Sequence, residues 1–255
     1  MRTQQLPRVM NAFSNLLIVI ATYNEIDSLP ILVAKLLELL PDVSILVIDD
    51  SSPDGTGKWC DEFAKSNSKF QVIHRPAKSG LGSATLLGLQ WAIEEGFEYA
   101  ATMDADLSHD PNSLLPMYHL IDEPHFGGPD VVIGSRYVKG GQIMGWPWYR
   151  RLSSRLLNTY VRLVLRLRTN DNSGAFRIYK TEALKKINLR KVESTGYAYL
   201  EEILWRLQMA KFKMAEHPIV FNNRTKGKSK ANLPEVIGSF IQIMKMSISK
   251  LRKKS

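Results

Sequence analysis

The chain has 255 residues, of which 44% are apolar and 23% are charged, and 34 basic against 25 acidic residues give it a net charge of +9. This composition is typical of a globular protein that is long enough to bury a sizeable core, as one α/β domain or as two small ones. The single cysteine, Cys60, excludes an intramolecular disulfide framework and a cysteine-based metal cluster, and it favours a reducing compartment.

Buried strands and amphipathic helices alternate in the first half of the sequence. The first apolar run, Leu16–Ala21, has the length of a strand and is too short for a signal peptide, and no apolar stretch approaches the roughly 20 residues that span a bilayer. The further predicted elements are a helix at Ser28–Leu40, a strand at Ser44–Ile48, a helix from about Thr56, a strand at Gln71–His74, a helix at Ser83–Glu95 and a strand at Tyr99–Met103. Strands that are buried on both faces and joined by helices predict a parallel, doubly wound sheet.

The pattern is less regular after Gly141. The predicted elements here are a Gly/Trp/Pro loop at Gln142–Arg151, a helix with arginine at every third or fourth position, a strand at Ala175–Tyr179, a helix at Tyr197–Ala210, a strand at Met214–Phe221, a basic loop at Arg224–Lys230 and a final helix from about Leu233. The sequence shows no internal repeat and no clear domain boundary, so we expect a soluble or peripheral protein without separate domains.

The positive charge is concentrated in two segments. Residues 136–170 contain eight basic residues and no acidic one, and residues 224–255 contain nine basic residues and one acid, Glu235. The remainder has 17 basic and 24 acidic residues, a net charge of −7. An acidic body with two basic segments indicates an anionic partner, which on charge alone can be a nucleic acid, a membrane surface or a phosphorylated substrate.

Acidic residues follow three of the predicted strands. They lie in Thr22–Glu25, Asp49–Ser52 and Asp104–Asp106. Ligands of parallel α/β sheets bind outside the carboxyl ends of the strands, so these residues are expected to share one edge. Carboxylates gathered there would repel a bare anion, but they suit a divalent cation that bridges to a substrate's phosphates.

Each of these motifs also has a structural interpretation. Asp49–Gly55 has the composition of a turn, and Asp104–Asp106 followed by Pro111 can be a loop that caps a helix. Gly80–Thr85 lacks the third glycine of a dinucleotide-binding motif and is better explained as a tight entry to a helix. The five histidines lack metal-ligand spacing, and there is no Gly-x-Ser-x-Gly motif, which argues against zinc and serine-hydrolase chemistry.

Taken together, the motifs make the family recognisable. In chain order they are Ala21–Glu25, Ile48–Thr56, Lys78–Ala84, Met103–His109, Gly134–Tyr137, Asp171–Arg177 and Arg224–Lys230. The chain resembles the family-2 glycosyltransferases, and within them the dolichyl-phosphate (polyprenyl-phosphate) mannosyltransferases, over residues 16 to about 240. The resemblance implies a single Rossmann-like nucleotide-sugar-binding domain of the glycosyltransferase A type, an α/β fold with a mostly parallel central sheet and C-terminal amphipathic helices. It divides the chain into an N-terminal extension (1–15), a catalytic domain (16–231) and a basic amphipathic C-terminal helix (232–255).

The resemblance also implies the residues that bind the donor, GDP-mannose. They are Ala21, Tyr23, Glu25, Ile48 and Asp50 around the guanosine, Asp104, Ala105 and Asp106 at the ribose-diphosphate end, and Arg224 and Lys230 over the phosphates. Asp104, Asp106 and Ser108 are the implied ligands of a divalent cation, Mg²⁺ or Mn²⁺, with Ser108 at a position where many members have glutamine. Alanine at position 21 replaces a frequent proline, a change of little consequence where the backbone makes the contact.

The implied acceptor is a dolichyl or other polyprenyl phosphate, and the implied reaction is an inverting, metal-dependent mannosyl transfer. The phosphate of the acceptor would be bound by Arg136, Arg150, Arg151, Arg155 and Ser173. Arg136 and Asp106 would have catalytic roles. A phosphate monoester is already anionic at neutral pH, so a strong general base is not required. The main alternative is transfer from another nucleotide sugar, such as UDP-glucose, to the same class of lipid.

Several features leave more than one interpretation open. Glu202 matches an acidic position common in the family but can equally be a surface carboxylate, and Trp146, Trp148 and Tyr149 can anchor the protein at a membrane interface or pack within their loop. In the tail, Val236, Phe240, Met244, Ile248 and Leu251 recur at helical spacing beside lysines. Such a helix can bind a membrane surface, a membrane-embedded partner subunit or the catalytic domain itself. We expect a cytoplasmic protein associated peripherally with the cytoplasmic face of a membrane.

Two other classes of function compete with the enzyme. A nucleic-acid-binding protein would use the two basic segments, but the acidic strand ends and the lack of a nucleic-acid-binding motif disfavour it. A catalytically inactive scaffold on a lipid surface would not need the metal ligands, so substitution of Asp106 separates it from the enzyme. We therefore expect no nucleic-acid partner.

Overall fold

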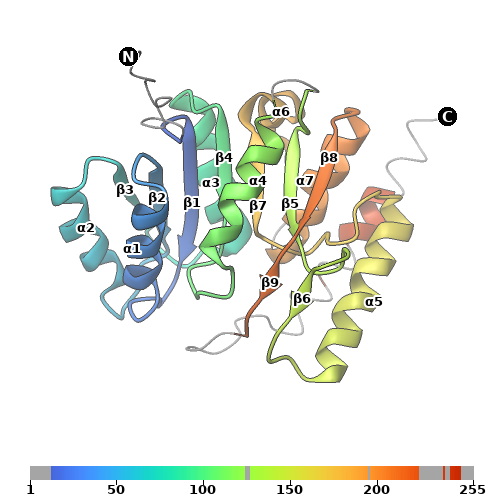
Figure 1. Ribbon diagram of the computed structural model, residues 1–255, viewed down its shortest axis with the longest axis horizontal. Helices are drawn as coiled ribbons and strands as arrows, with labels where there is room; N and C mark the ends of the chain where they lie inside the picture. The colour runs from blue at the N-terminus through green and yellow to red at the C-terminus, as the bar shows by residue number, and fades with distance from the viewer. Residues whose placement is uncertain (1–12, 124–126, 195, 224–237, 239–241, 248–255) are drawn as a thin grey trace, which may run out of the picture.

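The computed structural model describes residues 13–123, 127–194, 196–223, 238 and 242–247. Within these residues, seven strands form one sheet in the order β3-β2-β1-β4-β7-β5-β8, and helices cover both of its faces (Figure 1). The basic loop predicted at Arg224–Lys230, and with it the proposed donor ligands Arg224 and Lys230, lies outside the described residues.

The first half of the sheet agrees with the sequence prediction. The strands are β1 (Leu16–Thr22), β2 (Ser44–Asp49), β3 (Phe70–His74) and β4 (Tyr99–Thr102), and the helices that connect them are α1 (Leu29–Leu39), α2 (Thr56–Ser66) and α3 (Leu81–Glu94). All neighbouring pairs among these strands are parallel. Leu17 of β1 lies opposite Ser44 of β2 on one side and opposite Ala100 of β4 on the other. Their carboxyl ends therefore meet at one edge of the sheet.

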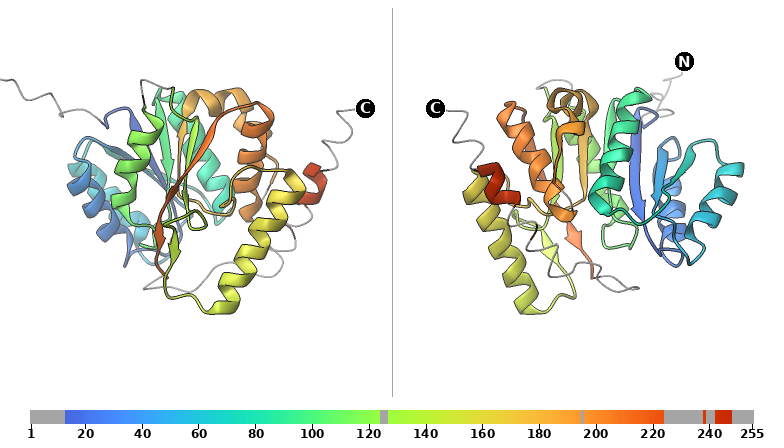
Figure 2. Two further views of the ribbon diagram at one scale, coloured as in Figure 1. Left: turned by 45° about the vertical axis from the view of Figure 1, so that its right-hand side comes forward. Right: turned by 180° about the vertical axis from the view of Figure 1, so that it is seen from behind.

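Burial on both faces explains why these strands read as continuous apolar runs. In β1, Leu16, Ile18 and Ile20 pack into the core under α1, α2 and α4 (Leu114–Ile121), whereas Leu17 and Val19 pack into the core on the opposite face. That second core lies under α3, α5 (Trp148–Leu165), α6 (Thr181–Ile187) and α7 (Tyr199–Met209), which Figure 2 shows from behind. Each strand thus contributes side chains alternately to the two cores.

The second half differs from the prediction in its strands. β7 (Arg177–Lys180) is antiparallel to both of its neighbours, β4 and β5 (Val131–Ser135), and it begins two residues after the predicted start. β8 (Met214–Pro218) is parallel to β5. The sheet is therefore mostly parallel, as the resemblance implied, but a strand from later in the chain is inserted between β4 and β5.

The predicted loop at Gln142–Arg151 contains regular structure. β6 (Gln142–Ile143) pairs in parallel with β9 (Val220–Phe221), and α5 starts at Trp148 directly after Pro147. The backbone of Pro147 is extended (φ −63°, ψ 154°), a conformation that ends one segment and allows a helix to begin at the next residue. Pairing with β9 stabilises a strand too short to be detected from sequence alone.

The predicted C-terminal helix is described only in part. Residues 242–247 are helical, and Ile243 and Met246 are buried in the core on the α5 and α7 side of the sheet. Met244, which the sequence placed on the apolar stripe, is exposed. Over the described residues, this segment therefore packs on the rest of the domain through Ile243 and Met246, while Met244 of the predicted stripe faces away from it. No described helix is both long enough and apolar enough to cross a membrane.

Candidate active site

A pocket lies at the carboxyl ends of β1, β2 and β4. Its lining residues come from the ends of these strands and from the entry to α3; they are Ala21, Thr22, Tyr23, Glu25, Asp50, Lys78, Gly80, Leu81, Ala84, Asp104, Ala105, Asp106 and Gly196. The structure thus brings together seven of the eight described residues that the sequence assigned to the donor. We call this the acidic pocket.

Ile48 is the exception among these eight residues. Its side chain is fully buried in the core on the α3 face of the sheet and does not line the pocket. The reason is strand alternation: Ile48 and Asp49 point to opposite faces of β2, and the chain leaves the strand only at Asp50. The Ile48 side chain therefore belongs to the core, and a contact between this residue and the donor stays a prediction.

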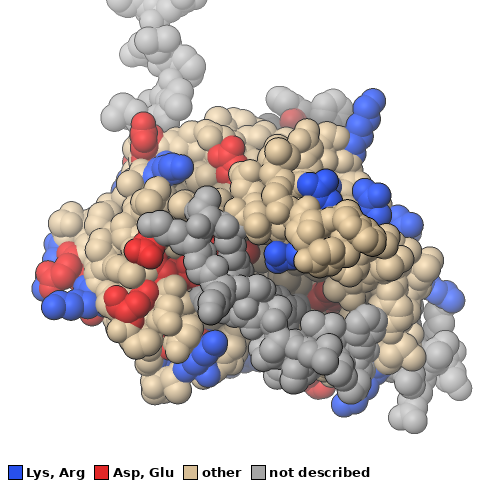
Figure 3. Space-filling view, turned by 90° about the horizontal axis from the view of Figure 1, so that it is seen from below, with Lys and Arg blue, Asp and Glu red and all other residues tan. Residues whose placement is uncertain are grey.

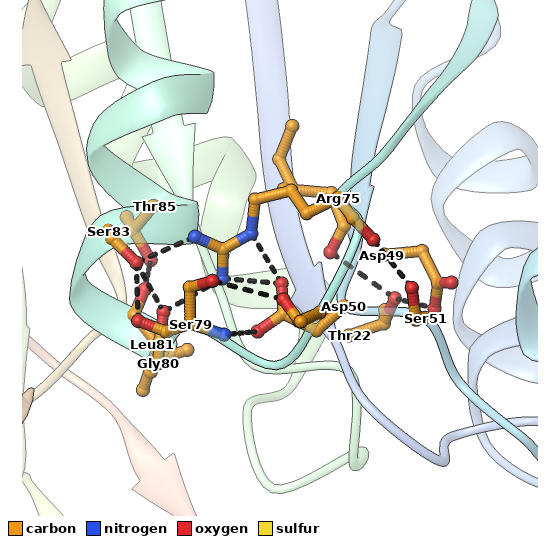
Figure 4. Close-up of polar contacts among 12 residues, drawn as sticks. Thr22, Asp49, Asp50, Ser51, Arg75, Ser79, Gly80, Leu81, Ser83 and Thr85 are labelled. Atoms are coloured by element: carbon orange, nitrogen blue, oxygen red, sulfur yellow. Dashed lines mark hydrogen bonds and ion pairs between the residues drawn. The ribbon is translucent and has the colours of Figure 1, made fainter.

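Asp50 is held by an arginine that sequence analysis did not identify. Arg75, which follows β3, pairs with the Asp50 carboxylate through Nε and Nη2 (Figure 4). Its Nη1 donates to Ser83 Oγ at 2.6 Å and its Nη2 to the Gly80 carbonyl at 3.0 Å, while the Ser79 N–H donates to Asp50 Oδ2 at 3.2 Å. Arg75 thus joins the carboxyl end of β2 to the loop that enters α3.

The other acids of the Asp49–Gly55 run stabilise the loop itself. Asp49 is buried and accepts hydrogen bonds from Thr22 Oγ1 (3.2 Å) and the Ser52 N–H (3.1 Å). Asp54 accepts from the backbone N–H groups of Ile26 and Thr56. Burial alone would raise the pKa of Asp54, but these hydrogen bonds and one from the Thr56 hydroxyl lower it below its usual value. The turn interpretation therefore holds for Asp49 and Asp54, whereas Asp50 faces the pocket.

The Asp-x-Asp segment ends in a tight turn. Asp106 is buried, and its Oδ1 accepts the Ser108 N–H at 3.0 Å across Leu107, whose φ is 62°. Ser108 is fully buried, and its Oγ has no hydrogen-bond partner in the structure. Ser108 does not line the acidic pocket, but its buried hydroxyl without a partner closely follows the two carboxylates in sequence, and these three side chains are hard oxygen donors of the kind that Mg²⁺ or Mn²⁺ prefers. Among the described residues, no three His, Cys, Asp or Glu side chains form a metal site by themselves.

His109 links this turn to the small β6–β9 sheet. Its Nδ1 accepts the Asp104 N–H at 3.2 Å, and its ring stacks on Phe176 (centroids 5.0 Å apart) and meets Phe221 edge-on (5.4 Å). Burial lowers the pKa of His109, so the imidazole is neutral at pH 7. Sequence analysis found no role for this histidine because its contacts come from β9 and the segment before β7.

Arg136 follows β5 and is bound by Asp171. Its Nε and Nη2 donate to the two carboxylate oxygens at 2.7 Å each, its backbone N–H donates to Oδ2 at 2.9 Å, and Nη2 also reaches Ser173 Oγ at 3.0 Å. Asp171 is fully buried and Arg136 is 9% exposed. Burial would raise the pKa of Asp171, but the Arg136 guanidinium outweighs it and lowers this pKa below its ordinary value.

A second pocket lies beside Arg136. It is lined by Arg136, Tyr137, Gly141, Gln142, Ile143, Met144, Trp148, Arg151, Leu152 and Arg155, and we call it the arginine pocket. Two residues predicted for the acceptor phosphate are not part of this lining. Arg150 lies over the Trp146 ring, 4.0 Å from its centroid, and Ser173 Oγ accepts from Asn158 as well as from Arg136. Ser173 therefore supports Arg136 from behind.

The two pockets are neighbours. The Arg136 guanidinium lies 5.4 Å from the centroid of the Phe221 ring, and the same ring contacts His109, which closes the Asp104–Asp106 turn. Phe221 and His109 thus connect an acidic pocket with an arginine pocket. This arrangement can hold a metal-bound anion on one side and a second anion on the other.

Glu202 is neither a surface carboxylate nor a residue of the two pockets, the two interpretations that the sequence left open. It is buried, and it accepts hydrogen bonds from Arg206 and from the Ser194 backbone and hydroxyl, so its role is to fix residues 193–194. Its neighbour Glu201 is also buried, which raises its pKa to about 7. Neither side chain is part of the acidic pocket or the arginine pocket.

Comparison with known proteins identifies the family. A family model described as glycosyl transferase family 2 matches residues 17–188. A polyprenol monophosphomannose synthase of Mycolicibacterium smegmatis is 40% identical over 225 residues, which cover 88% of this chain and 83% of that protein. The chain belongs to glycosyltransferase family 2. This glycosyltransferase is also 38% identical to an undecaprenyl-phosphate mannosyltransferase of Micrococcus luteus over 214 residues, 84% of this chain and 86% of that protein.

Solved structures show the fold of the glycosyltransferase. A glucosyl-3-phosphoglycerate synthase of Mycobacterium tuberculosis, in complex with Mn²⁺, UDP and glucosyl-3-phosphoglycerate, has a TM-score of 0.59 at 19% identity and covers 90% of this chain and 77% of its own. A mannosyltransferase of Pyrobaculum calidifontis, in complex with GDP-Man and Mn²⁺, has a TM-score of 0.57 at 16% identity and covers 94% of this chain and 64% of its own. The enzyme therefore has the glycosyltransferase A-type fold as a single domain with a mostly parallel sheet.

Proposed function

We propose that the enzyme transfers mannose from GDP-mannose to a dolichyl or other polyprenyl phosphate, with inversion at the anomeric carbon. The observation that carries the proposal is the acidic pocket lying next to the arginine pocket across His109 and Phe221. The two relatives at 38–40% identity are named for mannose and polyprenol or undecaprenyl phosphate, which supports both the sugar and the lipid.

The acidic pocket is the proposed donor site. Asp50, fixed by Arg75, faces the nucleoside, and Tyr23 and Glu25 line the same side. Asp104, Asp106 and the Ser108 hydroxyl would hold the divalent cation. When bound, this cation neutralises the negative charge that develops on the leaving diphosphate. The proposed contribution of Arg224 and Lys230 to the phosphates falls on residues outside the described part of the chain.

The arginine pocket is the proposed acceptor site. Arg136 cannot swing away, because both Asp171 oxygens hold its guanidinium, while Arg151 and Arg155 reach the same pocket from α5. Arginine side chains bind phosphate oxygens in a fixed geometry, which positions the acceptor for attack on the sugar. The phosphate is already a charged nucleophile, so the side chains act by alignment and charge neutralisation rather than by removing a proton.

A polyprenyl acceptor implies that the enzyme works at a membrane. We propose a peripheral association with the cytoplasmic face, either directly or through a membrane-embedded partner subunit. The basic segment at 136–170 supports an anionic surface as the partner, because it contains no acidic residue.

The donor and the acceptor are tested in one assay. Purified enzyme with GDP-mannose, Mn²⁺ or Mg²⁺ and a polyprenyl phosphate should form a mannosylated lipid phosphate, and EDTA should stop the reaction. UDP-glucose in place of GDP-mannose should give no product. If UDP-glucose gives product and GDP-mannose does not, the sugar is assigned wrongly. If no nucleotide sugar gives a lipid product, the proposed acceptor is rejected.

Arg75 is expected to position Asp50 for donor binding. Arg75→Ala should raise the KM for GDP-mannose about tenfold with little change in kcat, because Asp50 loses its main partner far from the reacting bond. Arg75→Lys should recover part of the loss, since a lysine keeps the charge but cannot pair through two nitrogens. Arg190→Ala, which removes an exposed arginine paired with Glu94, is the matched control. An unchanged KM in Arg75→Ala would show that Asp50 needs no such support.

A further inference from the structure

Three aromatic rings surround the guanidinium of Arg136. Its Cζ lies 5.3 Å from the ring centroid of Tyr137, 5.4 Å from that of Phe221 and 5.9 Å from that of Trp146. At these distances the faces of the rings attract the cation. The Phe221 and Trp146 rings also meet edge-on, with their centroids 5.4 Å apart. We call these three residues the aromatic frame.

The ion pair with Asp171 leaves one nitrogen of the guanidinium available. Nε and Nη2 of Arg136 donate to the Asp171 carboxylate, and Nη2 also donates to Ser173 Oγ. No hydrogen bond among the described residues uses Nη1 of Arg136. Because Arg136 lines the arginine pocket, Nη1 is the atom that remains to bind a phosphate oxygen there.

Phe221 also contacts the turn that holds the proposed metal ligands. Its ring meets the His109 ring edge-on, with the centroids 5.4 Å apart, and His109 Nδ1 accepts the Asp104 N–H at 3.2 Å. The backbone makes a second contact, because the N–H of the next residue, Asn222, donates to the Ser108 carbonyl at 2.9 Å. The end of β9 is thus fixed to the turn through a side chain and through the backbone.

Strand β9 lies between the two pockets. The Phe221 carbonyl accepts the Met144 N–H at 2.8 Å, and Met144 lines the arginine pocket. Figure 1 shows β9 between the carboxyl end of β1 and helix α5, and both views of Figure 2 show the same order. Figure 3 looks onto this edge of the sheet, with Asp and Glu mainly on the half that holds β1 and β2 and with Lys and Arg mainly on the half that holds α5. β9 therefore separates an acidic half from a basic half.

We propose that Phe221 is a positioning residue for the transfer reaction. The Asp171 ion pair fixes the Arg136 guanidinium to the loop before β7, and the Phe221 ring fixes it relative to the Asp104–Asp106 turn. An acceptor phosphate bound to Nη1 is thereby aligned with the sugar of a donor bound at the turn. Phe221 lines neither pocket, so it acts through Arg136. This role rests on the proposed function, because it requires one anion on each side of β9.

Steady-state kinetics with a short polyprenyl phosphate that dissolves in buffer test this role. Phe221→Leu should lower kcat at least about tenfold, because the missing ring leaves a space into which the guanidinium shifts, and a small displacement of aligned groups slows a reaction strongly. The KM for GDP-mannose should stay native. Phe221→Tyr, which keeps the ring, should restore most of the kcat. Titration with Mn²⁺ and GDP should give the same number of sites per chain in Phe221→Leu as in the native enzyme, which excludes unfolded molecules as the cause.

A double-mutant cycle with Arg136→Lys shows whether Phe221 acts through Arg136. Lysine keeps a positive charge beside Asp171 but lacks the planar guanidinium that the aromatic frame holds. In the Arg136→Lys background, Phe221→Leu should therefore have little further effect on kcat. Two independent contributions would instead multiply, as they would if Phe221 only stabilised the fold.

The matched control is Phe63→Leu. Phe63 on α2 is half-buried like Phe221, and it meets Phe70 edge-on with the centroids 4.9 Å apart, so the same atoms are removed from a similar aromatic contact outside both pockets. The control should keep the native kcat. A native kcat in Phe221→Leu, an equal loss in the control or multiplied effects in the cycle would overturn the role of Phe221 alone. A native enzyme that forms no mannosylated lipid phosphate would reject the proposed function, and this role with it.

Discussion

Asp106→Asn is expected to lower kcat for mannosyl transfer by about 10²- to 10³-fold without unfolding the protein. Asparagine has the same shape as aspartate and keeps the oxygen that accepts the Ser108 N–H, so the tight turn at Leu107 is preserved. The variant loses the negative charge of a side chain that we propose as a ligand of the divalent cation, together with Asp104 and the Ser108 hydroxyl. With less cation bound, the charge that develops on the leaving diphosphate is no longer neutralised.

The measurement combines steady-state kinetics with thermal unfolding. Mn²⁺ added with GDP should raise the Tm of the native enzyme and should not raise that of Asp106→Asn, because ligand binding to the folded state stabilises it. Asp27→Asn removes an equal charge from an exposed residue near the same edge of the sheet, outside the pocket lining, and serves as the control. An Asp106→Asn enzyme with native kcat, or with the native Tm shift, would remove this residue from the metal site.

The first half of the fold could be predicted because its signals are local. β1, β2 and β4 are buried on both faces, so they appear as unbroken apolar runs, and the helices between them have clear amphipathic spacing. Once these strands are parallel, their carboxyl ends must meet, which brings Glu25, Asp50 and Asp104 into one pocket. Strand position alone was therefore sufficient to assemble most of the acidic pocket.

The features that sequence analysis missed depend on long-range contacts. Arg75 lies 25 residues from Asp50, and only the pairing of β2 with β3 brings them together. The antiparallel insertion of β7 joins strands far apart in the chain, and no local pattern reports strand direction. Ile48 shows what a motif leaves open: the motif names the residue, but only the structure shows that strand alternation turns its side chain into the core.

The helix α5 was also only partly predictable. Its arginines were identified by spacing, but a sequence with apolar residues on two faces does not show which face packs on the domain. The structure settles this point, since Val161 and Leu165 are buried whereas Leu156 and Leu163 are exposed. Charge patterning indicated an anionic partner, and only the three-dimensional arrangement related that charge to the arginine pocket.

Asp171→Ala is expected to lower the free energy of unfolding by about 3–5 kcal/mol. Asp171 is fully buried, and its removal leaves the Arg136 guanidinium and the backbone N–H of Gly174 without their acceptor. The pKa of Asp171 in the folded state lies below its ordinary value of about 3.9. The ion pair therefore contributes its full stability above about pH 4 and loses it as the pH falls through the folded-state pKa, and the variant should lack this acid-dependent loss.

A double-mutant cycle with Arg136 separates the structural role of the pair from its role at the acceptor. Urea denaturation of Arg136→Ala, Asp171→Ala and the double variant should give a coupling energy of about 1–3 kcal/mol, because the double variant leaves no buried charge unpaired. The exposed Lys185–Glu182 pair should show no measurable coupling. The double variant should regain stability but not activity, since Arg136 lines the arginine pocket and alanine cannot bind the acceptor phosphate. A stable double variant with the native KM for polyprenyl phosphate would show that Arg136 only supports the fold.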